Sequence, residues 1–225
     1  MFYDPTFLLL IPVLILAFYA QRKVKGNYIK YSKVKNASGT TGAEVARNIL
    51  QSNGINDVKI QEIDGTLTDN YSSKKKELNL SHDVYHGDSI SAISIAAHEA
   101  GHAIQHAENY APLDIRTGIF PIANFGSMLA FPMFIIGLLM RTPLLMDIGI
   151  ILFAGALVFH VVTLPVEFNA SKRALAHLKK NYVANADEMT GAQKVLNAAA
   201  LTYVASTLMA LMQFLRLLVL RGSRD

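Results

Sequence analysis

Four long apolar stretches constrain the fold of this chain more than any other feature of its sequence. They cover residues 2–20, 119–140, 144–166 and 198–215. Each comes close to the about 20 predominantly apolar residues that a helix needs to cross a bilayer. Apolar residues make up 52% of the 225 positions, which is high for a soluble domain. We therefore predict a mainly α-helical integral membrane protein with about four transmembrane helices.

The distribution of basic residues predicts how these spans are oriented. Residues 21–118 and 167–197 hold 17 of the 21 lysines and arginines, and basic residues near span ends stay in the cytoplasm. The run "RKVK" follows the first apolar stretch, whereas the charges of a cleaved signal peptide would precede it. The predicted order is a retained anchor (1–20), a cytoplasmic segment (21–118), a transmembrane hairpin (119–166), a second cytoplasmic segment (167–197) and a last span with its tail (198–225).

Composition removes several classes of function. The chain has no cysteine, so disulfides and thiolate metal sites are excluded and a metal must be held by histidine, aspartate or glutamate. The net charge of +4 comes without a basic run interleaved with aromatic residues, so we expect no nucleic-acid partner. The lipid bilayer is the partner that the apolar stretches do predict, while the oligomeric state stays open.

The first cytoplasmic segment has a mixed α+β pattern. "GTTGAEVARNILQSNG" has helical spacing, with Thr41 as an N-cap candidate and Gly54 at its end. "VKIQEI" and "KELNLS" alternate apolar and polar residues and are predicted to be strands, the second an edge to which an extended peptide could be added. "GDSISAISIAAHEAGHAIQHAE" then predicts a helix of about 20 residues that begins after Asp88 or Ser89.

The sequence His98–Glu99–Ala100–Gly101–His102 lies within that last helix and has the spacing of a metal site. Residues four apart on a helix project side by side, so His98 and His102 can hold one zinc ion. Glu99 flanks the same face, where it can act as a general base without being a ligand. The small residues around the motif allow close packing of the helix. We therefore predict one bound Zn²⁺.

The remaining histidines are weaker candidates. His106 is about 12 Å along the helix from His98, too far to share one ion, and is expected to be a polar neighbour or a hydrogen-bond donor behind the site. His82 and His86 are expected to have surface or structural roles. His160 lies deep within the third span, where we expect it to form a hydrogen bond inside the helix bundle.

The predicted topology points to Glu167 as the third ligand. The motif helix precedes the second span, and Glu167 follows the third, so the hairpin brings both to one membrane face. An acid at that boundary is costly unless it is paired or bound to a metal. Two histidines, one glutamate and an open position form a catalytic zinc arrangement. His82, His86 and Asp187 are the alternatives for the third ligand.

Several segments resemble one known family. "LTDNY", "LNLSHDVY", "IAAHEAGHAIQHAENYAPL", "PVEFNASKRAL" and "VLNAAALTYVA" are similar to the YugP-like bacterial membrane zinc metallopeptidases, also described as neutral zinc proteases, over nearly the whole chain. The resemblance implies a zincin-like site with His98 and His102 as ligands, Glu99 as base and Glu167 as third ligand. More distant glutamate zincins carry an aspartate four residues after the ligand glutamate; here this position is Ser171, and Asp83, Asp88 or Asp187 could replace its support.

These observations predict a membrane-embedded zinc endopeptidase whose site faces the cytoplasm and whose substrates are peptides or membrane proteins. A second donor to the oxyanion stays open among His106, His177 and Tyr203. An iron enzyme would need more histidine clusters. A transporter would need polar groups in several spans. A non-catalytic metal-binding scaffold would not need Glu99, so that residue distinguishes a scaffold from a zinc endopeptidase.

Overall fold

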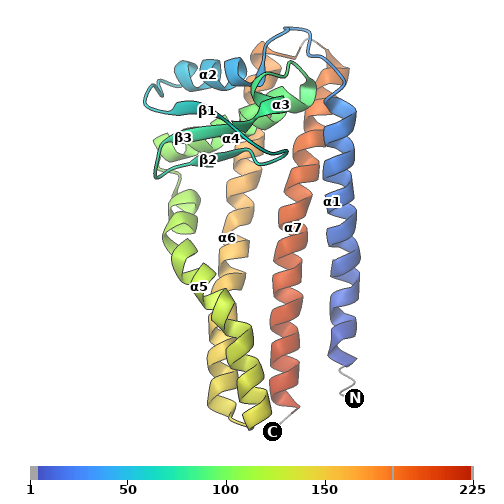
Figure 1. Ribbon diagram of the computed structural model, residues 1–225, viewed down its shortest axis with the longest axis vertical. Helices are drawn as coiled ribbons and strands as arrows, with labels where there is room; N and C mark the ends of the chain where they lie inside the picture. Colours follow the sequence, from blue (N-terminus) through green and yellow to red (C-terminus); the bar gives the residue numbers. More distant parts are fainter. Residues whose placement is uncertain (1–4, 184, 224–225) are drawn as a thin grey trace. The chain divides into compact units, whose positions relative to one another are not determined.

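The computed structural model describes residues 5–183 and 185–223 of the chain. Residues 2–4 of the first predicted span, and Arg224, lie outside these ranges. In chain order the elements are η1 (Pro5–Leu10), α1 (Ile11–Tyr31), α2 (Gly42–Ser52), β1 (Lys59–Ile63), β2 (Asn70–Ser72), β3 (Glu77–Ser81), α3 (His82–Tyr85), α4 (Ile90–Ala107), α5 (Ala111–Met140), α6 (Pro143–Asn181) and α7 (Ala186–Gly222) (Figure 1).

The chain forms two compact units. The first, the apolar unit, comprises residues 1–20, 114–165 and 202–225. The second, the mixed unit, comprises residues 21–113 and 166–201 and contains the whole sheet together with α2, α3 and α4. Helix α6 contributes its first part to the apolar unit and its second part to the mixed unit.

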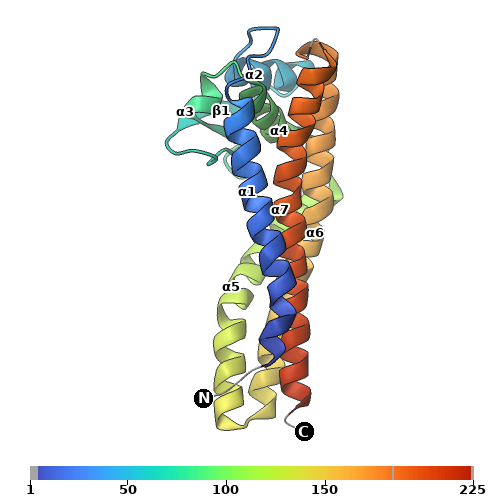
Figure 2. The same ribbon diagram turned by 90° about the vertical axis from the view of Figure 1, so that its right-hand side faces the viewer.

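Four helical stretches of the described chain are long and apolar enough to cross a membrane, as predicted. They are Pro5–Tyr31, Ala111–Met140, Pro143–Asn181 and Ala186–Gly222 (Figure 2). These helices are longer than the apolar stretches: α6 continues to Asn181 and α7 already begins at Ala186. The polar residues after position 166 include many good helix formers and no proline or glycine before 181, so the helix does not end where the apolar run ends.

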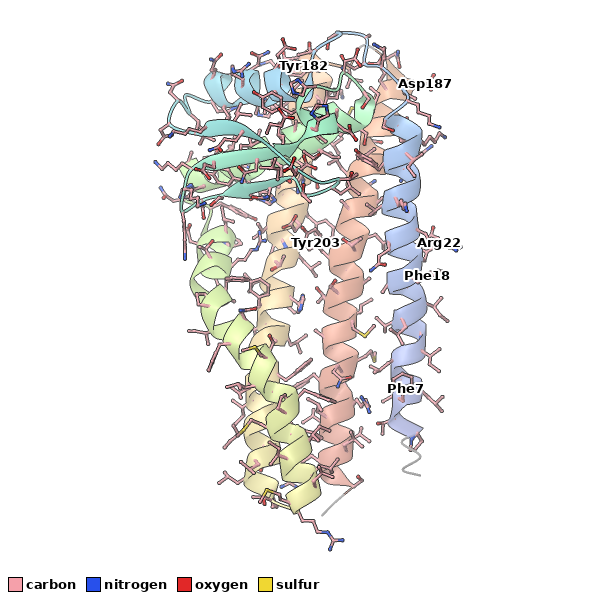
Figure 3. The ribbon with its side chains drawn as sticks, in the orientation of Figure 1. Phe7, Phe18, Arg22, Tyr182, Asp187 and Tyr203 are labelled. Carbon is pink, nitrogen blue, oxygen red and sulfur yellow. The ribbon has the colours of Figure 1, made fainter. Side chains whose placement is uncertain are left out.

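Large apolar side chains cover the outside of the apolar unit. Phe7 and Phe18 on the first helical stretch are half exposed (Figure 3), and Ile122 on α5 is 76% exposed. A smaller buried cluster lies inside the unit and consists of Phe134, Met146, Ile150 and Leu217. Exposed apolar surface of this extent indicates contact with lipid. Helices are suited to this environment, because they pair their own backbone N–H and C=O groups and can therefore cross a bilayer. The protein is therefore a membrane protein.

The sheet of the mixed unit has the order β1-β3-β2. Strand β3 pairs in parallel with β1 and antiparallel with β2. Our prediction that "KELNLS" is an edge strand is therefore wrong, because β3 is the central strand and both its sides are already paired. Its alternating Leu78 and Leu80 are fully buried, which suits a central position. The edge strand β2 was not predicted, since it has only three residues.

The helices of the mixed unit begin where the sequence predicts. Thr41 caps α2 in a capping box with Glu44, and Gly54 follows the helix with a φ of 73°. Ser89, rather than Asp88, caps α4, because its hydroxyl accepts a hydrogen bond from the Ala92 backbone N–H at 3.1 Å. Helix α4 is buried along most of its length and forms part of the main core of this unit.

Candidate metal centre

Three side chains from two helices of the mixed unit converge on one point. His98 and His102 lie on α4, with ring centroids 4.7 Å apart, and Glu167 lies on α6. The Glu167 Oε2 atom is 3.3 Å from His98 Nε2 and 3.6 Å from His102 Nε2. The structure thus brings together the three residues that the sequence predicts as metal ligands.

The spacing of these donor atoms fits a zinc ion. Ligands that bind zinc tetrahedrally at about 2.0–2.1 Å are separated from one another by roughly 3.3 Å, close to the distances from Glu167 to both rings. The three side chains are 12%, 10% and 2% exposed, in the order His98, His102 and Glu167. A buried carboxylate between two imidazoles is the donor set of a catalytic zinc site, with one coordination position left for water or substrate.

A glycine allows the two helices to approach closely enough to build this site. A Cβ atom added to Gly101 would lie 2.8 Å from the carbonyl oxygen of Ala170 on α6. Any other residue there would collide with backbone, which cannot move as a flexible side chain can. Gly101 precedes His102 directly on α4, and Ala170 lies between Glu167 and Ser171 on α6, so this contact controls how far His102 is from Glu167.

The orientation of His102 is determined by Gln105, one helical turn further along α4. The Gln105 amide donates to the Val166 carbonyl at 2.8 Å and to Asn169 Oδ1 at 3.0 Å. Its oxygen therefore faces His102 Nδ1, at 2.9 Å, and can only accept a hydrogen bond. In the neutral ring, Nδ1 of His102 therefore carries the proton, which leaves Nε2 as the nitrogen that can bind a metal ion.

His98 is supported by Ser171, the residue that stands where more distant zincins have an aspartate. Ser171 Oγ is 3.2 Å from His98 Nδ1, so a hydroxyl supplies the hydrogen bond. Two of the three aspartates considered as replacements face other groups. Asp83 accepts a hydrogen bond from Tyr28 at 3.4 Å, and Asp88 pairs with Lys35 at 2.7 Å.

Glu99 lies beside the ligand pair and is buried, with 8% of its surface exposed. Burial raises the pKa of its carboxyl group above the usual value, and the neighbouring His98 and His102 oppose that shift. The charges of Glu167 and Asp69 raise the Glu99 pKa further. A raised pKa makes the Glu99 carboxylate a stronger proton acceptor than the carboxylate of an exposed glutamate.

Asp69 is a partly buried acid whose charge acts on Glu99 and which sequence reasoning did not single out. It accepts hydrogen bonds from the backbone N–H and the hydroxyl of Ser81, at 2.7 and 3.0 Å. Burial raises the pKa of Asp69, and the hydrogen bonds from Ser81 oppose the shift. Asp69 belongs to the "LTDNY" segment but has no spacing signal, because its contact with Ser81 depends on the fold of the sheet.

The other candidate histidines do not join the site. His106 Nδ1 is 2.8 Å from the Tyr71 hydroxyl, and His177 lies 3.5 Å from the Asn53 amide. His160 lies in the apolar unit with its ring next to that of Phe159. His82, the first residue of α3, and His86, which follows that helix, are exposed, and both contact Glu62.

Two residues that orient the ligands, Gln105 and Asn169, were missed by sequence reasoning. Gln105 carried a usable signal, because it lies three residues after His102 on the same helix face. Asn169 had no such signal, since its contact with Gln105 joins α4 to α6 across a long separation in the sequence.

A family model and a curated relative both match most of the chain. The model of one protein family, described as "putative neutral zinc metallopeptidase", matches residues 6–222. A protein of Bacillus subtilis (strain 168) named "Putative membrane protease YugP" is 50% identical over 218 residues, which cover 96% of this chain and 97% of that protein. No solved structure matches the chain.

Proposed function

Because the chain belongs to the family described as neutral zinc metallopeptidases, we propose that it is a membrane-embedded zinc endopeptidase. Its substrates are peptides or membrane proteins, cleaved next to the cytoplasmic surface of the membrane. The observation that carries this proposal is the buried convergence of His98, His102 and Glu167, with the acid Glu99 beside them. A metal-binding scaffold has no use for that fourth, non-ligating carboxylate.

His98, His102 and Glu167 would hold the zinc ion. When bound, zinc supplies Lewis acidity, which polarises the scissile carbonyl group and lowers the pKa of water toward about 7. Ser171 and Gln105 keep the two imidazole rings aligned, so their Nε2 atoms need no reorientation during the reaction. These orienting contacts are internal to the mixed unit and exist before substrate binds.

Glu99 performs the proton transfers. Its carboxylate takes a proton from the attacking water as the new C–O bond forms at the carbonyl carbon. The same carboxyl group then gives that proton to the departing amine as the C–N bond breaks, which restores Glu99 to its starting state. The raised pKa of Glu99 favours the first of these transfers, in which its carboxylate accepts the proton.

The substitution Glu99→Gln tests this proposal most directly. The amide keeps the shape of the side chain but cannot accept a proton from water, so we expect zinc content to be retained and peptide cleavage to fall by at least about 100-fold. Zinc is measured by elemental analysis of the purified protein, and cleavage with a fluorogenic peptide mixture. Substantial turnover in this variant would exclude Glu99 as the base.

The cytoplasmic orientation has its own test. The charge distribution places Lys75 in the cytoplasm and Thr142, in the turn between the second and third spans, outside. In intact cells, an impermeant thiol reagent should modify the Thr142→Cys variant and spare the Lys75→Cys variant. The chain has no natural cysteine, so no background labelling interferes. The reverse pattern would put the peptidase on the outer surface.

A further inference from the structure

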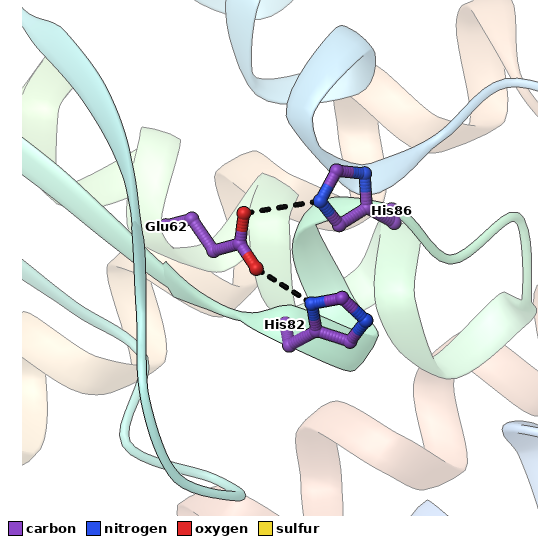
Figure 4. A group of neighbouring side chains, drawn as sticks. All are labelled: Glu62, His82 and His86. Carbon is purple, nitrogen blue, oxygen red and sulfur yellow. Dashed lines mark hydrogen bonds and ion pairs between the residues drawn. The ribbon is translucent and has the colours of Figure 1, made fainter.

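A second cluster of two histidines and a glutamate lies on the surface of the mixed unit. Glu62 on β1 contacts both histidines of the α3 region (Figure 4). Its Oε1 is 2.6 Å from His82 Nδ1, and its Oε2 is 3.0 Å from His86 Nε2. One donor atom from each of the three residues lies within 4.8 Å of the other two, as is also the case at the buried site.

The sheet topology explains why these residues meet. Strand β1 runs parallel to β3, with Glu62 opposite Leu80. The chain leaves β3 at Ser81 and enters α3 directly at His82, so the histidines emerge beside the end of β1. His86 follows His82 by four residues, which places the two rings on one side, with centroids 4.9 Å apart. The cluster is thus built by regular elements.

The surroundings of the cluster leave room for a hydrated ion. The side chains of His82, His86 and Glu62 are 70%, 56% and 42% exposed. His82 and His86 also line an open cavity of about 420 Å³. Imidazole and carboxylate donors together suit zinc and its neighbours among the divalent transition metals, and water can fill the remaining positions.

We propose that Glu62, His82 and His86 form a second metal site, which binds a divalent transition-metal ion such as Zn²⁺ at the protein surface. This site joins the end of β1 to α3, the short helix that precedes the α4 helix of the buried site. It is independent of the proposed peptidase activity. Its competitor is the proton, because the hydrogen bonds with Glu62 raise the pKa of His82 and those from both histidines lower the pKa of Glu62.

Zinc binding to the full-length protein in detergent tests the site. After removal of metal with a chelator, equilibrium dialysis against Zn²⁺ at pH 7.5 should give two ions per wild-type chain, one bound more tightly than the other. The variants His86→Ala and Glu62→Gln should keep the tighter ion and bind the second at least about 10-fold more weakly. Both changes are on exposed side chains, and circular dichroism checks that the fold is retained.

His177→Ala is the matched control, because within residues 5–183 and 185–223 no carboxylate is paired with the His177 ring and His177 lies outside both clusters. This variant should bind two ions with wild-type affinities. One ion per wild-type chain would overturn the proposal. Equal weakening in the His177 and His86 variants would also overturn it, since binding would then be general to surface histidines. Because the readout is metal rather than cleavage, the result does not depend on peptidase activity.

Discussion

The two histidine–glutamate clusters share a local pattern and differ in their surroundings. His82 and His86 flank an aspartate, Asp83, in the same way that His98 and His102 flank Glu99. The ring centroids are 4.9 Å apart in one pair and 4.7 Å in the other. In each case a glutamate from a different element completes the set of donors. The four-residue spacing thus brings the two histidines of each cluster together, whereas the fold supplies the third donor.

The difference lies in what holds the ligands. At the buried site, the second ring nitrogen of each histidine meets Ser171 or Gln105, and the glutamate is 2% exposed. Among the described residues, no hydrogen-bond partner faces the second ring nitrogens of His82 and His86. A buried site with oriented ligands can perform chemistry away from bulk water, whereas an exposed one can at most bind an ion. Burial and orientation, rather than the motif, separate the two functions.

Replacing the glutamate in each cluster should give the largest contrast. Glu167→Ala removes one of the three proposed zinc ligands. Loss of a residue that only orients a ligand costs up to about 100-fold, so we expect zinc affinity and peptide cleavage to fall by at least that factor. Glu62→Ala should leave cleavage unchanged. Zinc content and cleavage rate are measured on both variants and on Glu167→Gln, which keeps the volume of the side chain. Full zinc occupancy in Glu167→Ala would remove Glu167 from the ligand set.

The positions between the histidines offer a second contrast. Tyr85 stands in the surface pattern where Gly101 stands in the buried one, and Gly101 faces the backbone of α6. Gly101→Ala should destabilise the protein by about 1–3 kcal/mol, because the added methyl group overpacks the contact with Ala170. It should also weaken zinc binding, since the helices must separate.

Gly26→Ala is the control for that change. Gly26 is also within a helix, but no atom lies within 4 Å of the position of its Cβ. This variant should be neutral or up to about 1 kcal/mol more stable, because alanine favours the helix. Thermal denaturation of both variants provides the measurement. An equally stable Gly101→Ala protein would contradict the close approach of α4 and α6.

Local features of the fold could be predicted from the sequence. The four apolar helices, the capping box at Thr41 and the helix that carries the two ligand histidines depend on residues near one another in the chain. Glu167 was found because two consecutive spans must return to the same membrane face. That constraint comes from the bilayer and needs no knowledge of side-chain packing.

Features that depend on the pairing of distant segments could not be predicted. Strand β3 is central because β1 pairs with one of its edges and β2 with the other. The alternation of apolar and polar residues in the five-residue strand does not specify which strands pair with it. Glu62 meets His82 only through the register of β1 on β3. Ser171 could be suspected from its position after Glu167, but its hydrogen bond to His98 follows from helix packing.

Gln105→Ala should have an intermediate effect on the buried site. It removes the acceptor for His102 Nδ1 and leaves the Val166 carbonyl and Asn169 without the amide they share. Loss of such an orienting residue typically costs 10–100-fold in metal affinity or activity. Without Gln105, His102 would resemble His82 and His86, whose second ring nitrogens have no partner among the described residues. We therefore expect zinc to bind more weakly to this variant than to the wild type. Unchanged zinc affinity and cleavage would show that orientation by Gln105 is dispensable.

Ser171→Ala should weaken zinc binding less than Glu167→Ala, Gly101→Ala or Gln105→Ala does. The contact from its hydroxyl to His98 is 3.2 Å long and neutral, so its loss should cost roughly 1 kcal/mol, or about fivefold in zinc affinity. Ser94→Ala is the matched control, because Ser94 is a buried serine on α4 whose hydroxyl donates to the Ile90 carbonyl rather than to a histidine of the site. Zinc affinity by competition with a chelating dye should fall in the first variant and stay constant in the second. A loss in Ser171→Ala as large as that in Gln105→Ala would mean that the hydroxyl does more than a neutral hydrogen bond can do. Zinc affinity would then depend as much on the contact of Ser171 with His98 as on the contact of Gln105 with His102. The serine would thus contribute as much to zinc binding as the amide does, although more distant zincins have an aspartate at its position.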